Sequence, residues 1–398
     1  MMRLFTFHEM KRAVLILFLV ALFANTSKAA GKPVVSLLTC GSGNELYSTF
    51  GHSALRLYYP NEGKDLVFNF GLFNFNTPAF YWKFMRGKLE YMLGIQYMDD
   101  FIAQYKWEER WVKEQVLDLD SMQTARLVDR LEFLYLPANR YYLYSFLYKN
   151  CTSELRDIIF PLVEGAESSF KNSMAGVTDR ELINGYISGW PKFGINLILG
   201  SGLDKEISVY QSMFLPDNLY SGISVLQNGG KSLVSKDHYL YKAGNSYKER
   251  RDLPDYAISP LFVFVVLLLM VLVGLFKKRF GIIFSNIYLV LVSILGIVLS
   301  FIILVTEHKE LYMNLNLLWC NPFFLAVVYA SVKGLKKTER LLSAISLVFL
   351  ALLQLVWAFE VQYAEPGFVV IVITLSIVFL SRVFTPFRVQ KQMSSDSR

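Results

Sequence analysis

A helix start is predicted by the stretch NCTSELR at positions 150–156. Asn150 is a favourable N-cap, Glu154 lies in the first turn, and Pro161 limits the length of the helix. The partial positive charge at the N-terminus of a helix stabilises a thiolate, so this position would lower the pKa of the Cys151 thiol. Because the thiolate is the attacking form of cysteine, Cys151 is a candidate nucleophile.

A histidine partner for this thiolate is available at few positions. The chain contains four histidines, and His8 falls in the N-terminal apolar segment. His52 opens a predicted strand in the stretch GHSA at positions 51–54 and is the candidate base. A cysteine on a helix facing a histidine on a strand is the geometry of papain-like thiol enzymes. Those enzymes usually place the cysteine first in the chain, so this order requires a circularly permuted fold.

Both residues also have plainer interpretations. Cys151 could be an inert buried thiol, or it could form a disulfide with Cys40 in an oxidising compartment. His52 could be a strand histidine that hydrogen bonds to backbone. A disulfide would make the chain a membrane scaffold or a lipid-binding module rather than an enzyme. No cysteine pair has the spacing of a zinc site, so no metal is expected.

Composition indicates a membrane protein with a water-facing domain. Of the 398 residues, 54% are hydrophobic and only 18% are charged. The net charge of +7 suggests a nucleic-acid partner at first. However, the basic excess lies beside the apolar segments, where membrane topology explains it. No nucleic acid is therefore expected as a partner.

The chain divides into three segments. Residues 1–29 resemble a signal peptide, with Lys11 and Arg12 before a short apolar run, although an uncleaved anchor is the alternative. Residues 30–255 are polar and aromatic and can bury a core as one domain. Residues 256–398 contain five apolar runs near the length of a membrane-spanning helix, at about 258–276, 281–305, 315–332, 341–359 and 367–384.

Charge alternation between these runs predicts the topology. Basic clusters follow the first, third and fifth runs, which places them in the cytoplasm. The 30–255 domain and the loops 306–314 and 360–366 then lie outside, which in a Gram-negative cell is the periplasm. The protein is expected in the inner (cytoplasmic) membrane as a multi-pass protein.

The outside domain is expected to be α+β with a small antiparallel sheet. Strands are predicted at 34–39, 53–59, 66–70 and 115–119, with a hairpin turn at the stretch NEG, positions 61–63. A helix is predicted over 122–134 with Asp120 or Ser121 as its cap.

Several motifs together resemble a known family. They are LLTCGSGNELYSTFGHSA at 37–54, FNFG at 68–71, FNF at 73–75, NRYY at 139–142, NC at 150–151 and MFLPD at 213–217. The combination resembles the Lnb-type lipoprotein N-acyltransferases. The resemblance implies a circularly permuted papain-like domain, similar to NlpC-like hydrolases and lecithin–retinol acyltransferase, followed by an all-α domain of five transmembrane helices. It covers nearly the full chain.

The resemblance also implies a reaction. Cys151 would take an acyl chain from a membrane glycerophospholipid as a thioester and pass it to the N-terminal amine of a diacylated lipoprotein, with His52 as the base. No cofactor is expected, and no Gly-rich phosphate loop is found. The enzymatic alternative is a thiol peptidase, amidase or phospholipase that acts on other substrates of the cell envelope.

Further candidate residues have weaker support. In the predicted hairpin, positions near 69–72 face the His52 strand, so Asn69 is the candidate for orienting the histidine. An asparagine there could instead satisfy a turn, and Glu45 could be a surface carboxylate. The candidates for substrate binding are Glu45, Asn74, Arg56, Arg140, Asn150, His308 and Asn321. For His308 and Asn321, interfacial anchoring is an equal alternative.

Overall fold

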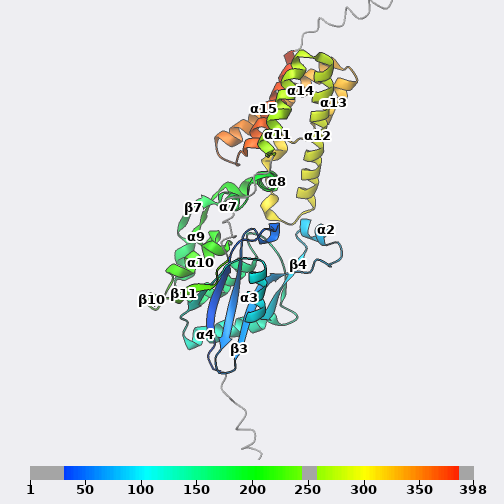
Figure 1. The fold of residues 1–398 in the computed structure, drawn as a ribbon. Coiled ribbons are helices and arrows are strands. Elements are labelled where there is room, and N and C mark those ends of the chain that lie inside the picture. The colour runs from blue at the N-terminus through cyan, green and yellow to red at the C-terminus, as the bar shows by residue number, and fades with distance from the viewer. Residues whose placement is uncertain (1–30, 244–257, 385–398) are drawn as a thin grey trace, which may run out of the picture.

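The structure of the protein is a computed structural model that describes residues 31–243 and 258–384. The expected signal peptide at 1–29 lies outside the described residues. Figure 1 shows two parts, which we call the polar part, residues 31–243, and the apolar part, residues 258–384. The polar part carries the sheet, and the apolar part is a bundle of helices joined to one end of it (Figure 1).

The main sheet of the polar part has seven strands in the order β11-β5-β1-β2-β3-β4-β6, and every neighbouring pair is antiparallel. Its strands are β1 (Val34–Cys40), β2 (His52–Tyr59), β3 (Lys64–Leu72), β4 (Glu90–Tyr97), β5 (Val112–Leu117), β6 (Tyr141–Leu143) and β11 (Val234–Tyr241). The predicted α+β class and the hairpin between β2 and β3 are confirmed, with Tyr59 paired to Lys64 beside the turn.

Helices and short strands surround this sheet. The helices are η1 (Leu46–Ser48), α2 (Phe80–Met85), α3 (Met98–Trp107), α4 (Ser121–Tyr135), α5 (Cys151–Ile159), η2 (Phe160–Leu162), α6 (Ala166–Lys171), α7 (Asp179–Asn184), α8 (Gly189–Ile198), η3 (Ser201–Asp204), α9 (Val209–Ser212) and α10 (Pro216–Val225). Strand β7 (Met174–Thr178) pairs with β8 (Glu206–Ser208), and β9 (Gln227–Asn228) pairs with β10 (Lys231–Ser232).

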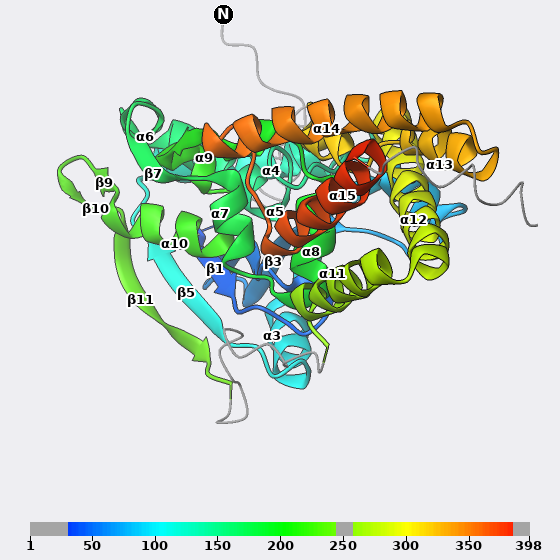
Figure 2. The same ribbon diagram turned by 90° about the horizontal axis from the view of Figure 1, so that it is seen from above.

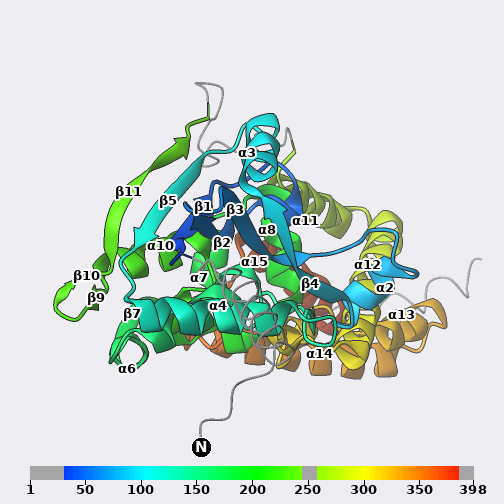
Figure 3. The same ribbon diagram turned by 90° about the horizontal axis from the view of Figure 1, so that it is seen from below.

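Each face of the main sheet packs against different helices. Successive side chains of a strand point to opposite faces, so neighbours such as Leu37 and Leu38 enter different cores. Leu37 lies in the larger core with residues of α4, α5 and α10, whereas Leu38 packs with Phe101 and Tyr105 of α3. Figure 3 shows α3 on one side of the sheet and α4 on the other. The helix that begins at Cys151 is therefore held against one fixed face of the sheet.

The apolar part consists of α11 (Pro260–Phe276), α12 (Lys278–Val305), η5 (Lys309–Leu311), η6 (Leu315–Leu318), α13 (Phe324–Val332), α14 (Lys336–Ala358) and α15 (Pro366–Phe384). Figure 2 looks onto this bundle from above. Within the described residues, three helices are long and apolar enough to cross a membrane, namely Arg279–Val305, Lys336–Ala358 and Pro366–Phe384, and Pro260–Phe276 is a shorter apolar helix.

The third expected span, 315–332, is not one continuous helix. It begins with the short helix η6, and regular α-helix starts only at Phe324 and lasts nine residues. Pro322 lacks a backbone N–H, and the Asn321 side chain accepts from the N–H of Phe323 at 3.0 Å, which forms a turn. The Asn316 side chain donates to the carbonyl of Asn196 in the polar part at 3.1 Å. The segment 315–332 therefore contains two short helices joined by a turn, and its membrane span stays a prediction.

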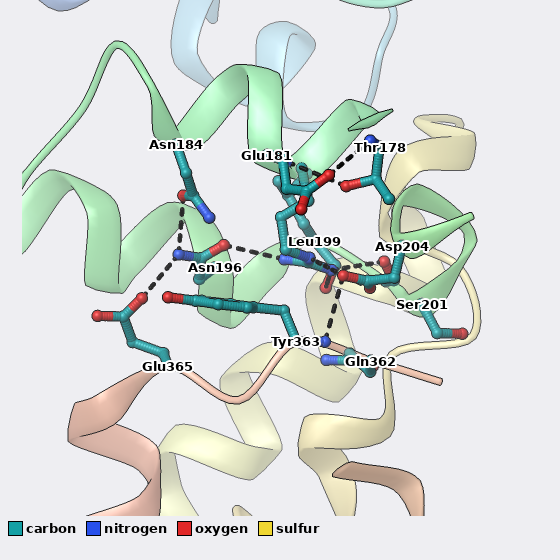
Figure 4. A network of polar contacts seen from close by, with 12 residues as sticks. Thr178, Glu181, Asn184, Asn196, Leu199, Ser201, Asp204, Gln362, Tyr363 and Glu365 are labelled. Atoms are coloured by element: carbon teal, nitrogen blue, oxygen red, sulfur yellow. Dashed lines mark hydrogen bonds and ion pairs between the residues drawn. The ribbon is translucent and has the colours of Figure 1, made fainter. Parts of the chain in front are cut away.

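A hydrogen-bonded junction joins the two parts. Asn196 on α8 donates to Glu365, directly before α15, at 2.9 Å, and the N–H of Tyr363 donates to Asp204 at 3.2 Å (Figure 4). The buried Arg180 binds the carboxylate of Asp204 at 2.7 Å and the side chain of Asn196 at 3.0 Å.

The loop 306–314 contacts the polar part as well, because Asn314 donates to the carbonyl of Leu197 at 2.8 Å. The loops 306–314 and 360–366 therefore lie on the same side of the bundle as the polar part, in agreement with the topology predicted from charge.

The junction predicts a sensitive glycine. A Cβ at Gly200 would lie 1.7 Å from the carbonyl oxygen of Tyr312. Gly200→Ala should therefore separate the two parts locally and lower the stability of the detergent-solubilised protein by about 1–3 kcal/mol. The midpoint of thermal unfolding measures the loss. Gly202→Ala is the matched control, because no atom lies within 4 Å of a Cβ there. Equal effects of the two substitutions would contradict the tight junction.

Candidate functional site

Cys151 is the first residue of α5, as the sequence predicts, and Asn150 is its N-cap. The Asn150 side-chain oxygen accepts from the N–H groups of Thr152 at 2.9 Å and Ser153 at 2.8 Å. Its amide group donates to the carbonyls of Phe146 and Phe214. The Asn150 side chain is therefore used entirely to position the helix, and its expected substrate-binding role has no free atom to support it.

His52 and Asn69 lie next to Cys151. His52 begins β2, Asn69 lies on β3, and α5 packs against both strands. The Nε2 atom of His52 is 2.7 Å from the side-chain oxygen of Asn69, which can only accept, so Nε2 carries the hydrogen. The other ring nitrogen of His52 is then left for its hydrogen bond with the Cys151 thiol. Three distant sequence positions thus form one cysteine–histidine–asparagine arrangement.

The electrostatics of this arrangement favour a thiolate. Burial alone raises the pKa of the Cys151 thiol. The charge of His52, its hydrogen bond, and hydrogen bonds from the Ser53 backbone and the Thr152 hydroxyl outweigh burial and lower this pKa to about 7. Burial also lowers the pKa of His52, but the charge of Cys151 and hydrogen bonds to Cys151 and Asn69 raise it above its ordinary value. Both shifts favour the thiolate–imidazolium pair near neutral pH.

The backbone of β3 passes close to the thiol at Gly71. A Cβ at Gly71 would lie 3.8 Å from the Cβ of Cys151, and the φ angle of Gly71 is +89°, a conformation that favours glycine. Gly71 thus allows the strand to turn past Cys151 while the Cys151 side chain stays partly exposed.

Two tyrosines near Cys151 were not assigned a role from the sequence. The pKa of the Tyr142 hydroxyl is raised well above its ordinary value, first by burial and then by the charge of Cys151. Tyr144 is affected in the same way, and its ring stacks on Tyr91 with centroids 4.3 Å apart. The Tyr142 hydroxyl is buried without a well-formed hydrogen bond among the described residues. Both residues lie on or beside the short strand β6, where the NRYY motif was the available signal.

The remaining predicted residues lie in other surroundings. Glu45 is exposed before η1, and Asn74 accepts from the N–H of Asn76 at 2.9 Å in a turn. Neither side chain hydrogen bonds to His52, Asn69 or Cys151 within the described residues.

The candidate arginines bind protein groups. Arg56 is paired with Asp65 and with Glu114 at 2.7 Å, so its guanidinium is committed to carboxylates. Arg140 lies over the ring of Tyr141, 5.1 Å from its centroid, and donates to its hydroxyl at 3.1 Å.

The two candidate residues of the apolar part lie at turns. The Nε2 atom of His308 is 2.9 Å from the carbonyl oxygen of Phe84, which ties the loop after α12 to α2. Asn321 caps the turn before α13. Both side chains are thus used in contacts within the described part of the chain, and their substrate-binding role stays a prediction.

The alternative of a disulfide between Cys40 and Cys151 was wrong, because both cysteines are free. Cys40 is buried in the core under α3 and interacts with the hydroxyl of Tyr105, and burial raises the pKa of its thiol to about 12. The scaffold interpretation that depended on this disulfide loses its basis. A surface cavity of about 550 Å³ lies beyond the other end of α5, lined by Phe160 and Lys171 among others, and does not include the thiol site.

The fold and the site define a class: an integral membrane protein whose outside domain carries a thiol–imidazole pair. Residues 23–181 match the Lnb N-terminal periplasmic domain, and residues 252–390 match the Lnb transmembrane domain. The chain is therefore a membrane protein of the Lnb family, with its N-terminal domain in the periplasm and its helices in the inner membrane. No curated protein and no solved structure matches it.

The shifted pKa values predict how fast Cys151 reacts with iodoacetamide. The rate should rise with pH around a midpoint near 7, because only the thiolate reacts. His52→Gln removes the stabilising positive charge, so the midpoint should move upward by one unit or more. The measurement uses Cys40→Ala/Cys320→Ala protein, which leaves one thiol. A midpoint that is the same with and without His52 would contradict the pair.

Proposed function

We propose that this protein is a lipoprotein N-acyltransferase. It would move an acyl chain from a glycerophospholipid to Cys151 as a thioester and then to the N-terminal amine of a diacylglyceryl-cysteine lipoprotein. The observation that carries the proposal is the position of the Cys151–His52 pair, at a helix N-terminus and next to aromatic residues that lead toward the membrane helices. The cysteine–histidine–asparagine arrangement in reversed chain order supports a circularly permuted papain-like fold.

The aromatic residues form a continuous series, which we call the aromatic track: Phe75, Phe80, Phe73, Tyr91 and Tyr144. Ring centroids along it are 5.0 Å apart for Phe75 and Phe80, 5.8 Å for Phe80 and Phe73, 5.0 Å for Phe73 and Tyr91, and 4.3 Å for Tyr91 and Tyr144. At the inner end of the track, the charge of Cys151 raises the pKa of the Tyr144 hydroxyl after the larger effect of burial. The track is apolar and suits an acyl chain better than a peptide.

The outer end of the track meets the apolar part at α2. The Thr306 hydroxyl, just after α12, donates to the carbonyl of Met85 at 2.8 Å, and the Trp82 ring stacks on Phe301 of α12 with centroids 6.2 Å apart. The views in Figures 1 and 3 agree that α2 lies beside α12. Tyr81, Trp82 and Phe84 are exposed, as expected of aromatic residues at a membrane–water interface. A phospholipid in the outer leaflet is therefore the donor that this geometry favours.

In the first half-reaction, the Cys151 thiolate attacks the carbonyl carbon of an acyl ester. The carbon–sulfur bond forms, the ester carbon–oxygen bond breaks, and the His52 imidazolium protonates the leaving lysophospholipid oxygen. Asn69 keeps the His52 ring oriented for this transfer. The Tyr142 hydroxyl lies beside Cys151 and interacts with the Gly71 backbone, and its own hydrogen is suited to donate to the oxyanion that develops at the carbonyl.

In the second half-reaction, a primary amine attacks the thioester. The product is an amide, which is more stable than the thioester and the starting ester, so no ATP is needed. Water can attack the thioester in place of the amine. The protein would then act as a phospholipase, which is the enzymatic alternative if no amine acceptor is used.

A complementation test addresses the acceptor. The parent chain and Cys151→Ser are expressed in a cell that lacks its own lipoprotein N-acyltransferase, and the N-terminal peptide of a lipoprotein is weighed. The parent should add a third acyl chain, and Cys151→Ser should add none, because the serine hydroxyl is not ionised near neutral pH. A peptide that stays diacylated despite correctly inserted parent protein would refute the assignment.

The aromatic track predicts a dependence on chain length. Phe75→Ser removes an exposed ring at the outer end of the track, so kcat/KM for a long-chain phospholipid donor should fall about three- to tenfold. A donor with short chains should be affected much less. Met122→Ser is the matched control, because Met122 is similarly exposed but lies on α4. Equal losses for both donors would show that Phe75 does not contact the chain.

A further inference from the structure

Glu310 is a buried carboxylate in the loop that follows α12. Its residue is only 5% exposed and lies in the short helix η5. One side-chain oxygen, Oε1, accepts from the Ser145 hydroxyl of the polar part at 2.7 Å. The Glu310 carbonyl accepts from the N–H of Gly200 at 2.8 Å, at the tight junction described above. The polar part thus holds the Glu310 side chain through Ser145 and the Glu310 backbone through Gly200.

The second carboxylate oxygen of Glu310 has no partner. Oε2 is buried and accepts no hydrogen bond within residues 31–243 and 258–384. None of the ion pairs in that part of the chain includes Glu310. A buried carboxylate oxygen without a donor is costly, so the site is incomplete as the protein stands.

Glu307, in the same loop, shows the opposite behaviour. It is exposed and forms an ion pair with Lys88 at 2.9 Å, and this hydrogen bond lowers the pKa of its carboxyl. The loop therefore provides a counter-charge for its exposed glutamate and none for its buried one. Of these two glutamates, Glu310 is the one whose carboxylate has an oxygen without a partner among the described residues.

The surroundings of Glu310 are negative. Asp179, at the start of α7, responds to its charge: burial first, and then the charge of Glu310, raise the pKa of the Asp179 carboxyl to about 6. The pKa of the Tyr148 hydroxyl is also raised, first by the partial burial of this side chain and then by the charges of Glu310 and Asp179. Such a negative region attracts a cation.

A short series of contacts connects the Glu310 carboxylate to the segment that precedes Cys151. Ser145, which binds Glu310, pairs with Lys149 through two backbone hydrogen bonds of 3.1 and 2.9 Å, and Cys151 follows two residues later. Tyr144, the residue before Ser145, responds to both groups: after the larger effect of burial, the charges of Cys151 and Glu310 each raise the pKa of its hydroxyl.

We propose that Glu310 forms the subsite for the acceptor of the transfer reaction and binds its primary ammonium group through the free Oε2 atom. The inference rests on the proposed function and adds the residue that selects an amine over water. The depth of the site fits such an acceptor. Glu310 follows the last residue of α12, Val305, by five positions, and the amine of a lipid-anchored cysteine is only a few bonds from its lipid chains.

In the transfer step, Glu310 can accept a proton from the bound ammonium group. The bound ammonium loses one proton, to Glu310 or to solvent, before the neutral amine attacks the thioester carbon. The carbon–nitrogen bond forms and the carbon–sulfur bond breaks. The second proton leaves the nitrogen as the amide forms and reaches the Cys151 thiolate by way of His52. The products are the amide, the free thiol and one released proton.

Glu310→Gln tests the subsite, because glutamine can still accept from Ser145 but cannot hold an ammonium as an ion pair. The full-length protein is placed in phospholipid vesicles with a synthetic diacylglyceryl-cysteine peptide. The thioester, weighed on the intact protein without acceptor, should form within about twofold of the parent rate. Transfer to the peptide should fall about 10- to 100-fold, as expected for loss of a charge-assisted contact. Release of the acyl chain by neutral hydroxylamine should not change.

Glu307→Gln is the matched control and should leave both half-reactions unchanged. Transfer at the parent rate by Glu310→Gln would overturn the proposal. An equal loss of thioester formation and transfer would also overturn it, because Glu310 would then act only on the structure of the site.

A binding measurement separates this inference from the proposed chemistry. Cys151→Ala protein should bind the peptide with a free N-terminus about 10-fold or more tightly than the N-acetylated peptide, and Glu310→Gln should abolish the difference. If the parent forms no thioester but Cys151→Ala protein still binds the free-amine peptide more tightly, the proposed acyl transfer is refuted and the amine subsite is supported. Equal binding of the two peptides overturns the subsite whatever the chemistry.

Discussion

The first turn of α5 positions the groups on which the site depends. Asn150 satisfies the N–H groups of Thr152 and Ser153 with one oxygen and fixes itself to two backbone carbonyls with its amide group. Cys151 is the next residue, so its sulfur is held at the positive end of the helix. Because α5 packs on the two strands that carry His52 and Asn69, the same cap sets the geometry of the whole arrangement. The thiolate is stabilised by neighbours that fold into place before any substrate arrives.

Local chemistry allowed this part of the site to be predicted from the sequence. A cap residue followed by a helix is a short-range signal, and the β2–β3 hairpin brings Asn69 beside His52 by strand pairing alone. Glu310 could not be found in this way. Glu307 and Glu310 are the same residue type in the same loop, and only tertiary contacts with Lys88 and Ser145 distinguish them. Long-range contacts of this kind have no counterpart in local pattern or periodicity.

The interrupted helix in the third apolar run shows that hydropathy alone does not predict where a helix breaks. The segment 315–332 is apolar enough for a membrane helix. Its backbone nevertheless forms two short helices, because asparagine and proline residues favour a turn between them. Asn316 is fully buried and donates to two carbonyls of the polar part, and Asn314 donates to the same helix end, so these asparagines hold the start of an apolar segment against the periplasmic domain. The preceding helix η5 also contacts the polar part, since the carbonyl of Glu310 accepts from the N–H of Gly200. A local exception to the hydropathy pattern therefore helps to build the junction.

This junction matters for the chemistry because the two parts of the molecule each supply one element of the proposed site. Cys151 comes from the periplasmic domain, whereas Glu310 and the helix contacted by α2 come from the membrane domain. A thiolate on a freely moving domain would meet water more often than a lipid ester or an amine at the membrane surface. Fixing the domain through Asn196, Asp204 and Gly200 keeps the thiol next to the membrane interface, where both proposed substrates are found. Under the proposed function, the membrane domain is therefore more than an anchor, since it supplies Glu310 to the proposed acceptor subsite.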